Sequence, residues 1–250
     1  MYISYGLFRA SSENSCGIFG MVRTCKIPCL PTPQLIYQTV SSHFGKTSRM
    51  KNEILESIEF IISQNIAVDS DSGEIAFYGL TSKSELQYRD KIAFNLYRKY
   101  NDKYNVIREW KKCDLAVLEK NSDKPIALIE FKVCYSCDLY KPSTIKEYTI
   151  AIKSDFEKSK KLSDKETEVY SILFIVKPKE KIPNELKEVV KYRTSINAGF
   201  NKLGDAENIE MIGEANLRSE FKNIEFKEIR NEKAFGIQCG LGYCVIKNES

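Results

Sequence analysis

The sequence has only one histidine, His43, in 250 residues, and it has no long hydrophobic run. A single histidine excludes zinc sites that use several imidazole ligands. The most apolar stretches, such as residues 171–176, are far too short to cross a bilayer. Residues 1–21 carry Arg9 and Glu13 and lack a continuous apolar segment, so we predict no signal peptide, no membrane partner and a cytoplasmic location.

The chain also lacks internal repeats and low-complexity tracts. Its charged fraction of 29% and hydrophobic fraction of 42% are typical of a soluble globular protein. The net charge of +4 permits nucleic-acid binding without arguing for it. A cluster of prolines at positions 28, 31 and 33 breaks any regular pattern near the N-terminus. We therefore predict an N-terminal extension over residues 1–48 and a single domain over residues 49–250.

Eight cysteines are present, but the chain is neither short nor visibly secreted, so we expect them to be reduced. Cys134 and Cys137 form a CxxC pair, and Cys25 and Cys29 form a CxxxC pair. Two such pairs can make a structural zinc site. The irregular spacing counts against zinc, and small buried hydrophobes are the alternative interpretation of these side chains.

Apolar periodicity predicts a mixed α/β fold. Helices are predicted over residues 50–64, 81–100, 145–162 and 184–190, and strands over residues 74–80, 104–110, 113–118, 125–133 and 169–176. After residue 190 the pattern predicts short strands and turns, ending in residues 235–246. The second helix is predicted to start at a capping box made by Ser82 and Glu85. Three antiparallel strands, a helical crossover and a further strand make a central mixed sheet flanked by helices.

Three charged residues interrupt two of these apolar strands: Asp114 in the first, and Glu130 and Lys132 in the second. The polar residues 119–124 between the strands predict a hairpin loop. If the turn centres on Ser122, Asp114 lies opposite Glu130. Lys132 is two residues further along and therefore shares that face of the sheet.

Such a cluster is costly to bury unless it binds a metal or performs chemistry. The alternative is an internal ion pair in which Lys132 neutralises Asp114 or Glu130. One lysine cannot satisfy two acids, and the surplus carboxylate favours a divalent cation.

This order of elements, with Asp114 followed by Glu130-Phe131-Lys132, resembles the PD-(D/E)XK nuclease superfamily and its restriction-endonuclease-like core. The resemblance covers roughly residues 80–180. It departs at Cys113, where many relatives have proline.

The resemblance implies that Asp114 and Glu130 bind one or two Mg²⁺ ions, for which Mn²⁺ substitutes. It also implies that Lys132 orients or activates the attacking water. Many relatives place a further glutamate on the preceding helix, and Glu85 is the candidate because Ile92 and Leu96 lie on the same helical face. The alternative role for Glu85 is in the capping box.

The resulting hypothesis is a Mg²⁺-dependent DNA endonuclease of the restriction or host-defence type, with a homodimer as a plausible assembly. Three alternatives stay open: a repair or recombination nuclease, a non-catalytic nucleic-acid-binding module, and a zinc-stabilised interaction protein. Two surface features have two interpretations each: they contact DNA, or they are ordinary packed or solvated side chains. They are the aromatic residues Trp110, Tyr135 and Tyr140 and the lysines at positions 146, 153, 158, 160 and 161.

Overall fold

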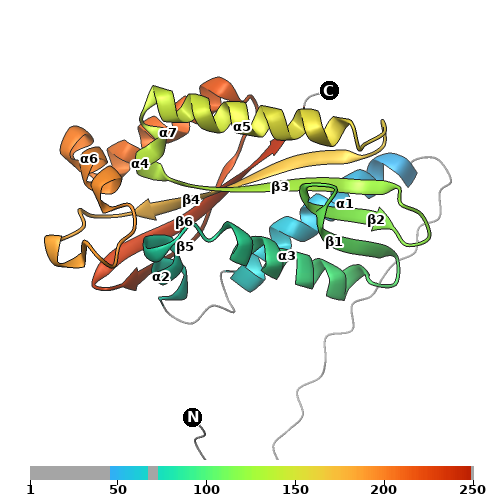
Figure 1. Ribbon diagram of the computed structural model, residues 1–250, viewed down its shortest axis with the longest axis horizontal. Helices are drawn as coiled ribbons and strands as arrows, with labels where there is room; N and C mark the ends of the chain where they lie inside the picture. Colours follow the sequence, from blue (N-terminus) through green and yellow to red (C-terminus); the bar gives the residue numbers. More distant parts are fainter. Residues whose placement is uncertain (1–45, 67–72, 249–250) are drawn as a thin grey trace, which may run out of the picture. The chain divides into compact units, whose positions relative to one another are not determined.

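The computed structural model describes residues 46–66 and 73–248 (Figure 1). These residues belong to one compact unit of the chain, residues 43–250. Most of the predicted extension over residues 1–48 lies outside the described residues, as do His43 and the pair Cys25 and Cys29.

Helices and strands alternate along most of this unit. The helices are α1 (Lys46–Ile61) with its π-helical continuation η1 (Ile62–Ile66), α2 (Glu74–Thr81), α3 (Glu85–Tyr100), α4 (Ser136–Leu139), α5 (Pro142–Lys160), the 3-10 helix η2 (Asn184–Leu186), α6 (Arg193–Leu203) and α7 (Ala206–Glu220). The strands are β1 (Tyr104–Trp110), β2 (Cys113–Glu119), β3 (Pro125–Tyr135), β4 (Glu168–Pro178), β5 (Phe226–Ala234) and β6 (Ile237–Lys247).

The strands form one six-stranded sheet in the order β1-β2-β3-β4-β6-β5. β3 and β4 run parallel, joined through α5, whereas every other neighbouring pair is antiparallel. The predicted mixed sheet with flanking helices is therefore confirmed. None of the described helices is long and apolar enough to cross a membrane.

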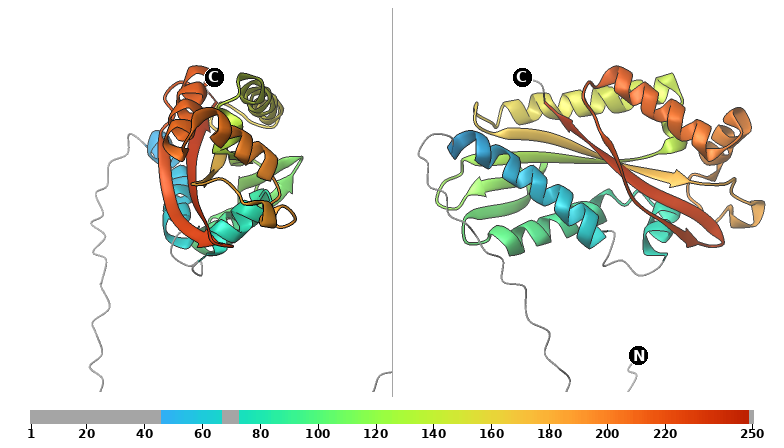
Figure 2. Two further views of the ribbon diagram at one scale, coloured as in Figure 1. Left: turned by 90° about the vertical axis from the view of Figure 1, so that its left-hand side faces the viewer. Right: turned by 180° about the vertical axis from the view of Figure 1, so that it is seen from behind.

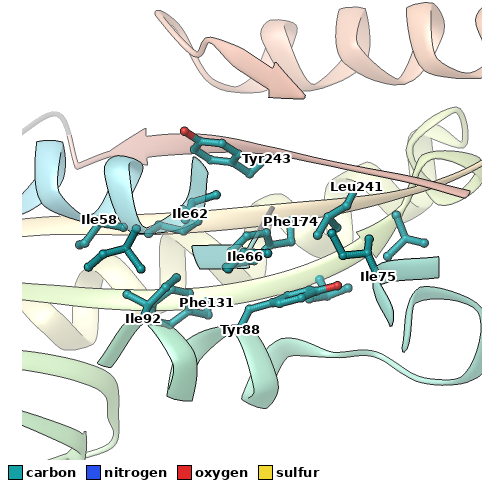
Figure 3. Packing of buried hydrophobic residues seen from close by; sticks show 14 of the residues in the cluster. Ile58, Ile62, Ile66, Ile75, Tyr88, Ile92, Phe131, Phe174, Leu241 and Tyr243 are labelled. Atoms are coloured by element: carbon teal, nitrogen blue, oxygen red, sulfur yellow. The ribbon is translucent and has the colours of Figure 1, made fainter. Parts of the chain in front are cut away.

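Helices cover both faces of the sheet, and each face has its own hydrophobic cluster (Figures 1 and 2). On one face, side chains from α1, α2 and α3 pack against alternate residues of the strands; Phe131 of β3 and Phe174 of β4 stack there at 6.5 Å (Figure 3). On the other face, Ile152 of α5 and Leu217 of α7 pack against the remaining residues. β3 and β4 are buried on both faces, which explains their nearly continuous apolar sequences.

The β2–β3 hairpin has the predicted register along its inner part. Ala116 pairs with Leu128, and the same register continued along the strands places Asp114 opposite Glu130. A bulge after Val117 pairs Leu118 with Pro125, so the register near the turn differs from the prediction by one residue. The bulge changes the turn and leaves the charged end of the hairpin in the expected alignment.

The prediction of a strand over residues 74–80 is wrong, because these residues form α2. Glu232, from β5, accepts hydrogen bonds from the backbone N–H groups of Gly73 at 3.0 Å and Ile75 at 2.9 Å. A carboxylate there satisfies the free N–H groups at the start of a helix and complements its dipole. The stabilising partner is 157 residues away in sequence from Ile75, so no local pattern reveals it.

The predicted capping box is also wrong. α3 begins at Glu85, its N-cap residue is Ser84, and no side chain caps the helix there. Residues 82–84 separate α2 from α3. Tyr135 helps to fix this break, since its buried hydroxyl donates to the carbonyl oxygen of Gly79 at 2.5 Å.

Two helices after residue 190 were not predicted, whereas the helix predicted over residues 184–190 is limited to η2. Asp205 caps α7 by accepting a hydrogen bond from the N–H of Asn208. The interior glycine of α7, Gly213, weakens the helical signal in the sequence. It is required by packing, because a Cβ atom there would lie 2.9 Å from the Cβ of Leu139 in α4.

Candidate functional site

The site lies where β3 extends past the end of β2. The pairing of the two strands ends at Leu115 and Ile129, and β3 continues to Tyr135. The carboxylate of Asp114 accepts the N–H of Phe131 at 2.8 Å, in place of a backbone carbonyl. A carboxylate thus completes the hydrogen bonding of β3 at the point where the neighbouring strand stops.

Glu130 is the most buried acid of the site, with 4% of its surface exposed. Burial raises the pKa of its carboxyl to about 8, and the negative charge of Asp114, together with a hydrogen bond between the two carboxyl groups, acts in the same direction. The raised pKa favours the protonated form of Glu130 at neutral pH. The two acids are brought together as the sequence predicted.

Lys132 lies on the same face as Glu130 but is paired elsewhere. Its Nζ is 2.9 Å from a carboxylate oxygen of Asp155 in α5, and 4.0 Å from Glu130. Burial lowers the pKa of the ammonium group, but the hydrogen bond and charge of Asp155 outweigh burial and leave the pKa raised. Lys132 is a fixed cation beside the acid pair.

Asp155 is the site residue that the sequence analysis missed. It is buried, and it also contacts Lys158 at 2.8 Å. Burial raises its pKa, but the hydrogen bonds from Lys158 and Lys132 more than compensate, so the pKa is lowered and the side chain is charged. Asp155 follows Ile152 by three residues and precedes Phe156, so its position in the apolar stripe of α5 was a signal available in the sequence.

Glu85 stands at the start of α3, near the edge of β3. Burial raises the pKa of its carboxyl, whereas the charge of Lys132 and the backbone N–H of Val133 oppose that rise. The charge of Asp114 raises it further. Glu85 is thus electrostatically coupled to the predicted site, and capping is not its role, because the predicted capping box is absent.

Lys132 forms the internal ion pair that the sequence offers as the alternative: its ammonium lies 4.0 Å from Glu130, and its closer partner is Asp155 at 2.9 Å. Asp114 lies beside Glu130, and the negative charge of Asp114 helps to raise the pKa of the Glu130 carboxyl. A divalent cation held by both carboxylates would oppose that rise.

Whether a metal ion fits this site depends on the number and the chemistry of its side chains. Within residues 46–66 and 73–248, no group of three or more His, Cys, Asp and Glu side chains is gathered closely enough to hold a metal. The donor chemistry of Asp114 and Glu130 does fit a hard divalent cation, because carboxylate oxygens are suitable ligands and a cation can replace the proton of Glu130. Glu85 is a further carboxylate that is electrostatically linked to Asp114.

The predicted surface features behave mainly as structural groups. Tyr135 and Tyr140 are buried, and Trp110 is partly buried, so packing accounts for the first two. The five lysines of the α5 region are exposed, and Lys158 and Lys160 pair with acids of their own helix.

The CxxC pair does not form a shared site in the described chain. Cys134 packs into the cluster beneath α5 and α7, whereas Cys137 packs into the cluster on the other face. Burial raises the pKa of both thiols, which disfavours the thiolate form that zinc requires.

Comparisons of this chain with protein-family models, with curated proteins and with solved structures find no match.

Proposed function

We propose that this protein is a Mg²⁺-dependent endonuclease that hydrolyses phosphodiester bonds in DNA, with the chemistry of the PD-(D/E)XK nucleases. The observation that carries the proposal is the pair formed by half-buried Asp114 and buried Glu130 beside the ammonium of Lys132. The order of α3, three antiparallel strands, α5 and β4 supports it, since this is the order on which the resemblance rests. A restriction or host-defence role is the working form of the hypothesis.

Each residue has a role that its surroundings support. When bound, Mg²⁺ supplies positive charge and activates water for attack on the phosphate. Asp114 and Glu130 supply oxygen ligands, and Glu130 must first release its proton. Lys132 places an ammonium group where negative charge develops on the phosphate, and Asp155 holds that ammonium in position.

A non-catalytic nucleic-acid-binding module is the second candidate. The specific observation that favours it is the ion pair between Lys132 and Asp155, which partly neutralises the cation that the chemistry needs. In such a module the acid pair would have no catalytic role and its removal would leave DNA binding unchanged.

The test is cleavage of supercoiled plasmid and linear DNA with Mg²⁺, Mn²⁺ or EDTA. Wild-type protein is compared with Glu130→Gln, which keeps the size of the side chain and removes its ability to ionise. Glu157→Gln is the matched control, because Glu157 lies on the exposed surface of α5 and pairs with Lys160. The expected result is metal-dependent cleavage that falls by roughly 100-fold or more in Glu130→Gln and is unchanged in Glu157→Gln.

Cleavage that persists at the wild-type rate in Glu130→Gln contradicts the assigned site. No cleavage by wild type, with tight DNA binding in a gel shift, favours the binding module. The size of the active species in gel filtration tests the predicted homodimer in the same samples.

A further inference from the structure

A second feature adjoins the site at Lys132, which lines a pocket of about 430 Å³. Its walls come from the segment before α3, the C-terminal end of β3, α4, α5 and the start of α6. Binding pockets for small organic groups begin at roughly 300 Å³. The pocket is therefore large enough for one nucleotide, and it opens next to the lysine of the site.

One side of the pocket combines a cation with two aromatic rings. The ammonium of Lys83 lies 5.6 Å from the ring centroid of Tyr148 and 5.7 Å from that of Tyr192. Lys83 also donates a hydrogen bond to the hydroxyl of Tyr148 at 3.2 Å. Tyr192 packs against the buried ring of Tyr135 at 5.1 Å, which holds it in place. Tyrosine rings offer a stacking surface to a base, and the exposed lysine offers charge to a phosphate.

Another side carries hydrogen-bonding groups. The hydroxyl of Ser195 donates to a carboxylate oxygen of Asp138 at 3.1 Å, and the N–H of Tyr135 lies 3.4 Å from the other oxygen. Both Ser195 and Asp138 are only partly buried and line the pocket. A carboxylate accepts hydrogen bonds from the amino groups on the edge of a base.

We propose that this pocket binds one unpaired nucleotide of a DNA substrate next to the scissile phosphate, with its base on Tyr148 or Tyr192 and its phosphate at Lys83. This inference rests on the proposed function and specifies its substrate class. A base inside a duplex is stacked on both faces and must be flipped out at a cost in free energy before it can reach a tyrosine ring, so the pocket favours a single strand or a nucleotide that is already unpaired. This assignment favours the processing of DNA with an unpaired base over the cutting of fully paired sites.

The test measures binding in EDTA with the Glu130→Gln protein, so that no cleavage contributes. Three labelled DNAs are compared by fluorescence anisotropy: a paired duplex, the same duplex with one unpaired 2-aminopurine nucleotide, and a single strand. The measurement is repeated with Glu130→Gln proteins that also carry Tyr148→Leu or Tyr192→Leu, since leucine keeps apolar bulk and removes the ring. Tyr97→Leu is the control, since Tyr97 is an exposed tyrosine of α3 outside this pocket.

We expect the two DNAs with unpaired bases to bind about tenfold more tightly than the paired duplex. Each pocket variant should lose most of that preference, whereas Tyr97→Leu should keep it. The 2-aminopurine fluorescence should fall on binding, because stacking quenches it, and the fall should disappear in the pocket variants. Tyr148→Phe, which retains the ring, should behave as the unsubstituted protein and so controls for folding.

The pocket proposal is overturned if paired and unpaired DNA bind equally, or if the preference survives in both leucine variants. Metal-dependent cleavage would still establish the nuclease in that case. Conversely, ring-dependent preference in EDTA without cleavage of any DNA by wild type supports the pocket and overturns the nuclease.

Discussion

Two lysines on neighbouring parallel strands, one half-buried and one buried, differ in their acidic surroundings. Lys132 of β3 lies beside Asp155 and Glu130, and Lys177 of β4 lies among Glu210, Glu214 and Glu228. Lys177 has three ion-pair partners and Lys132 has two, so a count of ion pairs alone ranks the second cluster above the first.

The two clusters differ in how the negative charge of the acids is balanced. At Lys177, the lysine is buried and its glutamates reach solvent: 54% of the Glu228 side chain and 31% of the Glu214 side chain are exposed. Gly242 leaves room for the lysine stem, because a Cβ atom there would lie 3.2 Å from its Cε. At Lys132 the most buried group is an acid, Glu130, and it is bonded to another acid.

The burial of an acid next to another acid therefore distinguishes a candidate site from a structural cluster. Water can screen the exposed glutamates around Lys177, whose ammonium satisfies them. Solvent cannot do this for Glu130, which keeps a proton instead. We therefore place the proposed divalent cation at Asp114 and Glu130 and not among the glutamates around Lys177.

Removal of each lysine should separate the two clusters most strongly. Lys132→Met should lower cleavage by roughly 100-fold and stability only slightly, because Asp155 retains Lys158 as a partner. Lys177→Met should leave cleavage within a few-fold of wild type and lower the free energy of unfolding by about 3 kcal/mol, since it leaves three acids without their common cation. Thermal melts and cleavage rates of both variants check this. Equal losses of cleavage in the two folded variants would contradict it.

Stability should depend on pH at one cluster only. Glu130 has a folded pKa of about 8 against an ordinary value of 4.5, so the folded state holds the extra proton between these values. Stability in EDTA should therefore fall as pH rises through this window. Relative to Glu130→Gln, wild type should lose several degrees of Tm from pH 5 to 9, since 1 kcal/mol corresponds to about 2–4 °C in a domain of this size. Parallel melting profiles would show that Glu130 has no raised pKa.

The pKa of Lys177 predicts no such effect in that window. Burial lowers it, but the hydrogen bond and charge of Glu228 and its neighbours outweigh burial, so the pKa lies above its ordinary value of 10.5. Its stabilisation is present below that value and is lost only at higher pH. Lys177→Met should therefore shift the melting curve at all pH values from 5 to 9 without changing its slope.

The smallest effect is expected at Glu85. Glu85→Gln retains an oxygen for the N–H of Val133 but removes the charge felt by Asp114, so metal affinity should fall by roughly tenfold or less. Glu207→Gln is the control, because Glu207 is also an acid in the first turn of a helix. Titration of cleavage against Mg²⁺ concentration measures the difference. A response identical to that of Glu207→Gln would remove Glu85 from the site.

Local patterns in the sequence predict the half of the site that lies on the hairpin. Alternation and loop length place Asp114 opposite Glu130 because a register slip would turn the apolar residues out of the core. The same reasoning does not reveal Asp155, which approaches Lys132 only when α5 crosses from β3 to β4.

Long-range contacts also explain the errors in the fold. The short apolar run of α2 is compatible with a strand or a helix, and Glu232 stabilises the helix from a distant strand. Gly213 weakens the pattern of α7, and only the close contact with α4 shows why glycine is needed. The sequence does not single out Tyr148 and Tyr192, because only the packing of α5 and α6 brings them to one pocket.

The most direct test of the central claim is isothermal titration of the protein with Mn²⁺ at pH 7 in buffers of different ionisation enthalpy. If the metal replaces the proton that the raised pKa of Glu130 favours, binding should release about one proton per ion, and Glu130→Gln should abolish both the binding and the release. Absence of binding by wild type, or binding with the same proton count in Glu130→Gln, would contradict the claim that this acid pair is a divalent-metal site.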